Sequence, residues 1–267
     1  MIHFKLEDID KIIPVGQEPN LYLSWFWLTY GDLWLTFGNT TIYEYTKESL
    51  ELFGDKKLTP YNDYYIVRFL EDFTALFEKI NENIPKEIFD ITTNLKEFLS
   101  NTKKWLSLYE KNENQHSDFY FEEYWKLTSW VYQRSFDSAH LVGGPYLYFF
   151  RHHNKINIVW ETEYTLENGI TIWTAKNGNY EIKFSDFIEK VKTFSFQFFN
   201  EMDEQVKRAI KKDWQNITVD KERLVKEHQE RKEDFAANLS LLTQAPQENT
   251  DWKEIEELYK RMIREIQ

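Results

Sequence analysis

Side chains that could do acid–base or metal chemistry are densest between residues 134 and 163. This stretch holds Arg134, Asp137, His140, Arg151, His152, His153, Glu161 and Glu163. A histidine beside a carboxylate can transfer protons, and His140 and His152 with Asp137 could bind a metal ion. However, His152 and His153 are neighbours on an expected strand, so their side chains should point to opposite faces. The alternative is that Arg134 or Arg151 pairs with Asp137 and that the histidines lie at an exposed hairpin turn.

The chain carries none of the local motifs that mark common catalytic sites. It contains no G-x-x-x-x-G-K-S/T, G-x-G-x-x-G, G-x-S-x-G or H-E-x-x-H pattern. It has no cysteine, which excludes thiolate chemistry and disulfides. Gly143-Gly144-Pro145 does not fit a phosphate loop, because no lysine follows it and the next expected element is a strand. We therefore predict no catalytic residue, no metal and no cofactor, which favours a protein that is not an enzyme.

The charge of the chain restricts its partners. The formal net charge is −12, whereas proteins that bind nucleic acid or anionic membranes usually present basic surfaces. The charge disfavours both and allows a basic partner protein. The alternative is that the acidity only keeps an aromatic-rich chain in solution. The N-terminal residues are charged rather than apolar, and no stretch approaches the ~20 apolar residues of a membrane span, so we predict a cytoplasmic protein.

The elements that would position these residues begin with a repeat, "WLTYGDLWLTFGN", at residues 27–39. Two-residue turns at Gly31-Asp32 and Gly38-Asn39 would give a three-stranded meander with Leu35 opposite Ile42. Because side chains alternate along a strand, one face of this meander would be aliphatic and the other aromatic. The aromatic face would hold Trp25, Trp27, Thr29, Trp34, Thr36, Thr41, Tyr43 and Tyr45. It would be either covered by a helix or exposed as a recognition surface.

The rest of the chain alternates between helical and strand patterns. Apolar residues recur at helical spacing from Ile66 to Ile80, with Asn62 or Asp63 as the expected N-cap. Residues 118–132 form another expected helix, with Phe121, Tyr124, Trp125, Thr128 and Val131 or Tyr132 on one stripe. Hairpins are expected around Asn154-Lys155 and Asn177-Gly178, and helices after Ser185. This order predicts an α+β fold with antiparallel hairpins. We expect one domain, 1–267, whose helical C-terminal region, 185–267, is either packed on the body or semi-independent.

Several stretches together resemble a bacterial domain-of-unknown-function family, number 5984. They are "LSWFWLTYGDLWLTFG", "YYIVRFLEDFTALF", "RSFDSAHLVGGPYLYFFRHHNKINIVW", "DFIEKVKTFSFQFFNEMDEQV" and "LVKEHQERKEDF". The resemblance covers most of the chain and implies no known activity or catalytic residues. Members of this family resemble the accessory proteins of bacterial conflict systems, whose immunity proteins are acidic, cytoplasmic and not enzymes.

Three hypotheses for function follow. The first is a protein-binding module, such as an immunity protein that caps a basic toxin. Its candidate binding residues are Trp25, Trp27, Trp34, Tyr43, Arg134, Asp137, His140 and Arg151. The second is an enzyme or small-ligand binder with a pocket around Arg134, Asp137, His140 and Arg151. The third is a structural role in which the C-terminal helices hold an oligomer.

Overall fold

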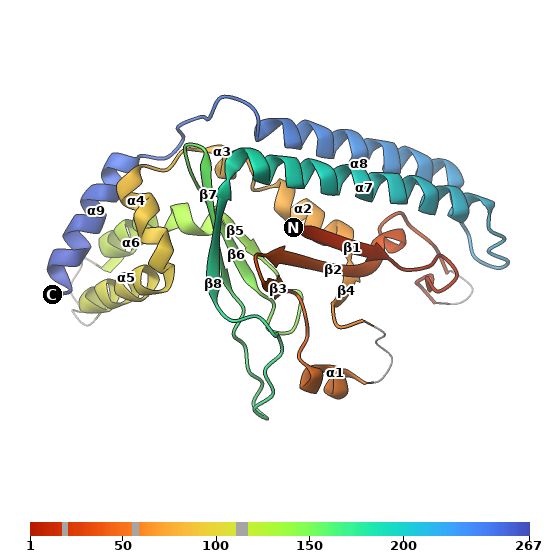
Figure 1. The fold of residues 1–267 in the computed structure, drawn as a ribbon, viewed down its shortest axis with the longest axis horizontal. Coiled ribbons are helices and arrows are strands. Elements are labelled where there is room, and N and C mark those ends of the chain that lie inside the picture. Colours follow the sequence, from red (N-terminus) through yellow and green to blue (C-terminus); the bar gives the residue numbers. More distant parts are fainter. Residues whose placement is uncertain (18–20, 55–58, 111–116) are drawn as a thin grey trace.

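The strands form two antiparallel sheets in the part of the chain that the computed structural model describes, residues 1–17, 21–54, 59–110 and 117–267 (Figure 1). The protein therefore has the predicted α+β fold. In the first sheet, β2 (Tyr30–Phe37) is central. It pairs with β1 (Ile2–Leu6) along one edge, and with β3 (Thr40–Ile42) and β4 (Asn62–Tyr65) along the other.

The predicted meander is half correct. Gly38-Asn39 joins β2 to β3 as expected, and Leu35 lies opposite Ile42. The predicted turn at Gly31-Asp32 is wrong, because β2 runs straight through both residues. Gly31 serves a close approach of two strands: a Cβ atom there would lie 2.2 Å from the carbonyl oxygen of Lys5 on β1. The residues before it, Trp27–Thr29, form a 3-10 turn instead of a first strand.

The predicted aromatic face is divided between the surface and the interior. Trp34 and Thr36 lie on the outer face of β2, half-buried, whereas Leu33 and Phe37 are buried on its inner face. Trp25 and Tyr43 are fully buried, so placing them with Trp34 on one face was wrong. Tyr43 follows the last residue of β3 with a φ of 68°, which ends the strand alternation before its side chain.

The second sheet has the order β5 (Ser135–Asp137), β6 (Tyr146–His152), β7 (Lys155–Glu161) and β8 (Gly178–Lys183). The hairpin between β6 and β7 is confirmed, but its two-residue turn is His153-Asn154 rather than Asn154-Lys155, because His152 lies opposite Lys155. The hairpin expected around Asn177-Gly178 is wrong, because β8 pairs with β7. A Cβ atom on Gly178 would lie 2.9 Å from the Trp160 ring, so packing on that ring requires glycine here.

The second sheet separates two hydrophobic cores, because alternate residues of β6 face opposite sides. Leu147 and Phe149 enter the main core, whereas Tyr148 and Phe150 enter the second core. The main core also contains Leu33, Ile42, Ile66, Ile158, Phe187, Phe198 and Phe235. The second core also contains Phe98, Trp105, Leu127, Trp130, Trp252 and Met262.

Helices cover the main core on the side away from solvent-facing Trp34. They are α2 (Ile66–Thr74), α3 (Phe77–Asn81), α7 (Phe184–Lys211) and α8 (Lys221–Leu241). Figure 1 shows α7 and α8 running side by side as a long antiparallel pair. The N-cap expected at Asn62 or Asp63 is wrong, since those residues belong to β4 and α2 begins at Ile66. The short α1 (Lys47–Phe53) lies near the first sheet.

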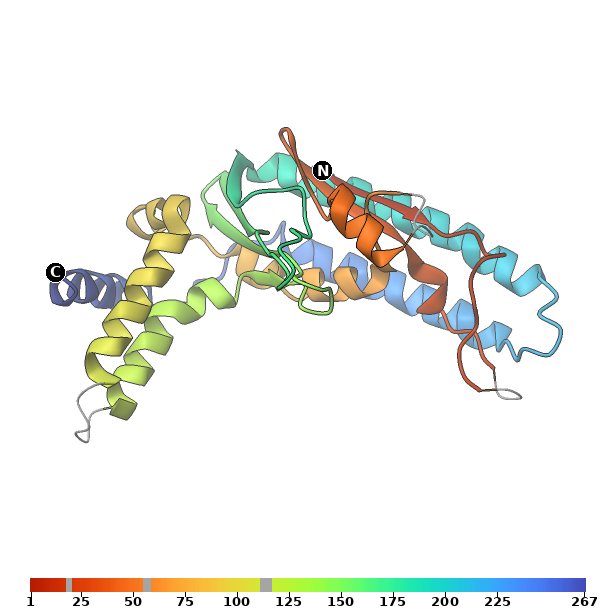
Figure 2. The ribbon, with the colours of Figure 1, turned by 90° about the horizontal axis from the view of Figure 1, so that it is seen from below.

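A helical lobe encloses the second core. It consists of α4 (Lys86–Ile91), α5 (Leu95–Glu110), α6 (Ser117–Tyr132) and α9 (Trp252–Glu265). Figure 2 shows α5 and α6 projecting away from the sheets as a pair. Within the C-terminal region 185–267, α7 and α8 therefore pack on the main core and α9 packs on the second core. The prediction of one domain stays a prediction.

Candidate functional site

Arg134 is a structural residue in the interior. It follows α6, has no exposed surface, and donates from one Nη atom to Glu82 Oε2 at 2.6 Å and from the other to the Trp130 carbonyl at 2.9 Å. Burial lowers the pKa of the guanidinium, and the Glu82 charge opposes this effect. The predicted pairing of Arg134 with Asp137 is therefore wrong. Glu82 is the buried carboxylate closest to it.

Glu82 fixes the segment that leads into α9. Its Oε1 accepts hydrogen bonds from the backbone N–H groups of Asn249 and Thr250, and its Oε2 accepts one from the Thr250 hydroxyl. The Arg134 guanidinium also lies 5.3 Å from the centre of the Trp252 ring. Only 1% of Glu82 is exposed, so this network joins α3, α6 and α9 away from solvent.

Arg151 lies at the opposite end of β6 from Asp137. Asp137 faces Tyr146 across the sheet, and Arg151 is five residues further along β6, roughly 17 Å away at ~3.3 Å per residue. Arg151 donates to the carbonyl oxygen of Asn81 at 2.6 Å and lies over the Phe184 ring. The four residues of the predicted polar pocket thus do not converge, and the predicted pairing of Arg151 with Asp137 is also wrong.

His140 and Asp137 remain close to each other. Exposed Asp137 accepts a hydrogen bond from the Ala139 N–H, and His140 packs on the rings of Tyr64 and Phe69. Burial lowers the pKa of His140, with Arg68 adding to the effect and Asp72 and Asp137 opposing it.

The two histidines at the end of β6 are arranged differently from the prediction. His153 has a φ of 50° beyond the end of the strand, so its ring lies 4.3 Å from that of His152 rather than on the opposite face. His152 Nδ1 lies 2.8 Å from the Ile84 carbonyl oxygen. Among the described residues, no group of three or more histidine, aspartate or glutamate side chains could hold a metal ion.

Two of the four aromatic candidates are wholly internal. The Trp25 indole donates to His228 Nδ1 at 3.1 Å, and His228 Nε2 lies 2.7 Å from Asp203. The Tyr43 hydroxyl bonds the Ser138 hydroxyl at 2.5 Å, and burial raises the pKa of Tyr43. Neither ring reaches the surface of the folded protein.

The other two aromatic candidates lie closer to solvent. Trp27 packs edge-on against Tyr65, with ring centres 4.7 Å apart. Trp34 is stacked between His3 at 5.4 Å and Tyr61 at 4.1 Å, on the outer face of the first sheet. Trp34 is thus the predicted candidate best placed to contact a partner, although its neighbours cover part of the ring.

The loop from Ser138 to Pro145 is held in one conformation by close contacts. A Cβ atom on Gly144 would lie 1.8 Å from the Ser138 carbonyl oxygen, and one on Gly143 would lie 2.2 Å from the Tyr164 ring. The Trp173 indole donates to the Gly143 carbonyl at 2.6 Å. The glycine pair therefore allows close packing of the loop.

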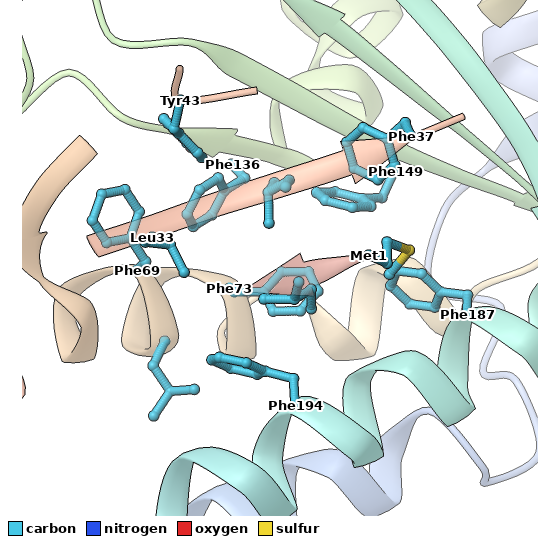
Figure 3. A pocket seen from close by; sticks show the side chains of 13 residues that line it. Met1, Leu33, Phe37, Tyr43, Phe69, Phe73, Phe136, Phe149, Phe187 and Phe194 are labelled. Atoms are coloured by element: carbon cyan, nitrogen blue, oxygen red, sulfur yellow. The ribbon is translucent and has the colours of Figure 1, made fainter. Parts of the chain in front are cut away.

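Two clefts flank this loop. One has a volume of about 750 Å³ and is lined by Tyr30, Asp32, Asp63 and His140, among others. The other has a volume of about 680 Å³ and is lined by Tyr146, Glu161, Glu163 and Tyr164, among others. A third space, of about 40 Å³, is lined by apolar side chains, including Leu33, Phe73 and Phe187 (Figure 3). Its lining suits packing rather than chemistry.

Exposed aromatic and acidic side chains gather beside the second cleft. Trp125 and Tyr132 stack along the outside of α6 and are 53% and 39% exposed. Tyr146 lies between Asp137 and Glu161 across the sheet, and the Glu161 charge also acts on Tyr132, whose pKa burial raises to about 12. We call this group the acidic–aromatic surface. Its members are Trp125, Tyr132, Asp137, Tyr146, Glu161, Glu163 and Tyr164.

Of this surface, sequence reasoning placed only Asp137 among the candidate binding residues, although Glu161 and Glu163 were part of the polar stretch that it considered for acid–base or metal chemistry. A signal was present on α6, because its sequence has two stripes. Leu127 and Trp130 are buried, and so are Thr128 and Val131 of the predicted stripe, whereas Phe121 and Trp125 of that stripe are exposed. A helix with one aliphatic-rich and one aromatic stripe could therefore have drawn attention to the second.

The comparisons with known proteins yield a family. The model of the Family of unknown function (DUF5984) matches residues 1–258. No curated protein and no solved structure matches the chain. None of the helices in the described ranges combines the length and apolar character needed to cross a bilayer.

Proposed function

This chain belongs to the Family of unknown function (DUF5984), and we propose that it is a non-enzymatic module that binds a basic partner protein at the acidic–aromatic surface. The observation that carries the proposal is the continuity of this surface. Trp125 stacks on Tyr132, and Glu161 is close enough to influence the pKa of Tyr132. Glu161 then faces Tyr146 across the strands.

The residue types of the surface suit binding. Tryptophan and tyrosine are enriched among the few residues that dominate protein interfaces, and contiguous exposed apolar area is uncommon on proteins that act alone. Tyr146 is 39% exposed and Tyr164 is 45% exposed. Their rings can bury area against a partner while Asp137 and Glu161 attract its basic side chains.

Charge supports the same type of partner. The net charge of −12 would speed association with a basic protein, and carboxylates at the contact would select against acidic ones. A basic toxin bound by an acidic immunity protein is one such pair. The specific form of the proposal is therefore that this chain is a cytoplasmic immunity protein.

A second candidate, small-ligand binding, is favoured by one observation. The cleft of about 750 Å³ is in the size range of ligand pockets, and His140 and Asp63 both line it. The Tyr30 hydroxyl donates to Asp63 there at 3.1 Å. Arg134 and Arg151, the other basic members of the predicted pocket, take no part in it.

The test is co-purification with the product of the neighbouring gene, using surface variants. The variant Trp125→Ser/Tyr146→Ser is expected to weaken binding at least about 30-fold, since each hot-spot ring contributes on the order of 2 kcal/mol or more. The control is Phe196→Ser, an equally bulky ring that is 70% exposed on α7, and it should bind normally.

Two results would count against the proposal. One is equal binding by the surface variant and the control. The other is a purified chain with no protein partner whose His140→Ala variant loses affinity for a small molecule, which would favour the second candidate.

A further inference from the structure

The end of the α7–α8 pair differs in charge from the rest of the molecule. Residues 207–226 contain seven lysine or arginine residues and three aspartate or glutamate residues, a net charge of +4, so the rest of the chain carries −16 to give the total of −12. At 1.5 Å per residue the 28 residues of α7 span roughly 42 Å. Since the Debye length at physiological salt is about 8 Å, the far end of α7 is electrostatically separate from the acidic body.

We call this end the basic tip and define it by Arg208, Lys211, Lys221 and Arg223. All four side chains are exposed, and none forms an ion pair within the described ranges. Lys211 and Lys221 line the same hollow of about 390 Å³ between the end of α7 and the start of α8. Figures 1 and 2 both place this end of the molecule opposite the C-terminus.

Helix stability does not explain the position of these charges on α8. Cations stabilise the C-terminal end of a helix and destabilise its N-terminal end, because the helix dipole is positive at its start. Lys221 and Arg223 lie in the first turn of α8, immediately after its N-cap Asp220. Asp220 and Glu222 complement the helix dipole at this end, whereas the positive charges of Lys221 and Arg223 oppose it, so helix stability does not account for these two cations.

Exposed apolar side chains border the same tip. Ile13 is 80% exposed and Tyr22 is 51% exposed, and both belong to the stretch before Trp27 that contacts the end of α7 and the α7–α8 connection. This stretch is held there by the ion pair of Lys212 with Asp10 and by the bridge between Tyr22 and Thr218. A binding surface that combines cations with uncovered apolar groups matches a segment that combines anions with apolar groups.

We propose that the basic tip docks an acidic segment of a second protein, one that carries apolar residues between its acidic ones. The positive charge of the basic tip is complementary to the negative charge of such a segment, and this is why we choose an acidic occupant. A basic partner would be repelled from Lys211, Lys221 and Arg223, so this docking is separate from that on the acidic–aromatic surface and does not depend on it.

The experiment measures fluorescence anisotropy of a labelled peptide of alternating glutamate and leucine with the full chain, at low and high salt. The triple variant Lys211→Gln/Lys221→Gln/Arg223→Gln is expected to bind about tenfold more weakly, which is roughly 1.4 kcal/mol. High salt should weaken binding by the parent more than by this variant. The control Lys183→Gln/Lys190→Gln/Lys253→Gln removes the same charge from other exposed positions and should bind like the parent.

A second variant tests the apolar part. Ile13→Ser is expected to weaken binding of the glutamate–leucine peptide while leaving binding of a pure glutamate peptide unchanged. Equal affinities of the two triple variants would overturn the proposal. So would binding to vesicles of anionic lipid without binding to the peptide, or self-association of the chain that the tip variant abolishes, because each would identify a different occupant.

Discussion

The two cores on either side of the second sheet are stabilised in different ways. The main core is packed mostly by apolar side chains and contains a space of about 40 Å³ lined by side chains such as Leu33 and Phe187. The second core holds the buried pair of Glu82 and Arg134 at its margin. Apolar packing is tolerant of shape, whereas a buried charge network functions only when every member is present. The second core should therefore be the less tolerant of single substitutions.

The largest expected effect is the loss of Glu82. Glu82→Leu leaves the Arg134 charge buried without its partner and removes the acceptor of the Asn249 and Thr250 N–H groups. We expect a loss of about 3–5 kcal/mol in the free energy of unfolding, measured by urea denaturation. Arg134→Met added to it should restore part of this loss, because it removes the unpaired charge.

The control is a solvent-exposed ion pair on the protein surface. Lys86 and Asp90 are 61% and 57% exposed, so Asp90→Asn should cost less than about 1 kcal/mol. If Glu82→Leu costs no more than this control, the buried network does not stabilise the second core, and the contrast between the cores disappears.

The next effect concerns the cavity of the main core. Leu33→Phe adds ring atoms at a residue that lines the cavity and is 4% exposed. We expect it to stabilise the protein by about 1 kcal/mol in the same denaturation experiment. The same substitution at Leu127, which is fully buried in the second core, should instead cost about 1–3 kcal/mol through overpacking. A loss of stability in both variants would show that the cavity cannot accept the ring.

Local sequence patterns predicted a turn correctly where the turn residues contact only the two strands that they join. The turn at Gly38-Asn39 was predicted correctly, and the hairpin between β6 and β7 was predicted with its turn displaced by one residue. Gly31 and Gly178 have the sequence context of turn glycines, but glycine is needed at these positions because Lys5 and Trp160 pack closely against them. Which strand approaches a glycine is not encoded near it, so these two turns could not be distinguished from real ones.

The candidate site shows the same limit at longer range. Arg134 looked like a member of a polar pocket because Asp137 and His140 are near it in the sequence, yet its partner, Glu82, is 52 residues away. Trp25 similarly finds His228 across the chain. The residue types indicated that these side chains form specific interactions. Whether those interactions stabilise the interior or bind a partner depends on burial, and burial depends on the whole fold.

The smallest expected effect is a pH dependence that arises at the border of the main core. His140 packs on Phe69, and its burial lowers its pKa in the folded state. A histidine with a lowered folded-state pKa favours folding only while it is neutral. The contribution is therefore present above the unfolded-state pKa of about 6.5 and is lost as the pH falls below it. His3, whose pKa burial also lowers, acts in the same direction.

His140→Gln should remove part of this slope. We expect the urea midpoint of the parent to fall more between neutral and mildly acidic pH than that of the variant, whatever the difference between them at neutral pH. The charges that act on the pKa of His140, those of Arg68, Asp72 and Asp137, are present in both proteins, so a change in slope would report the imidazole itself. Parallel slopes would mean that His140 is as well solvated in the folded chain as in the unfolded one, and that the polar border of the main core is more open than its packing on Phe69 indicates.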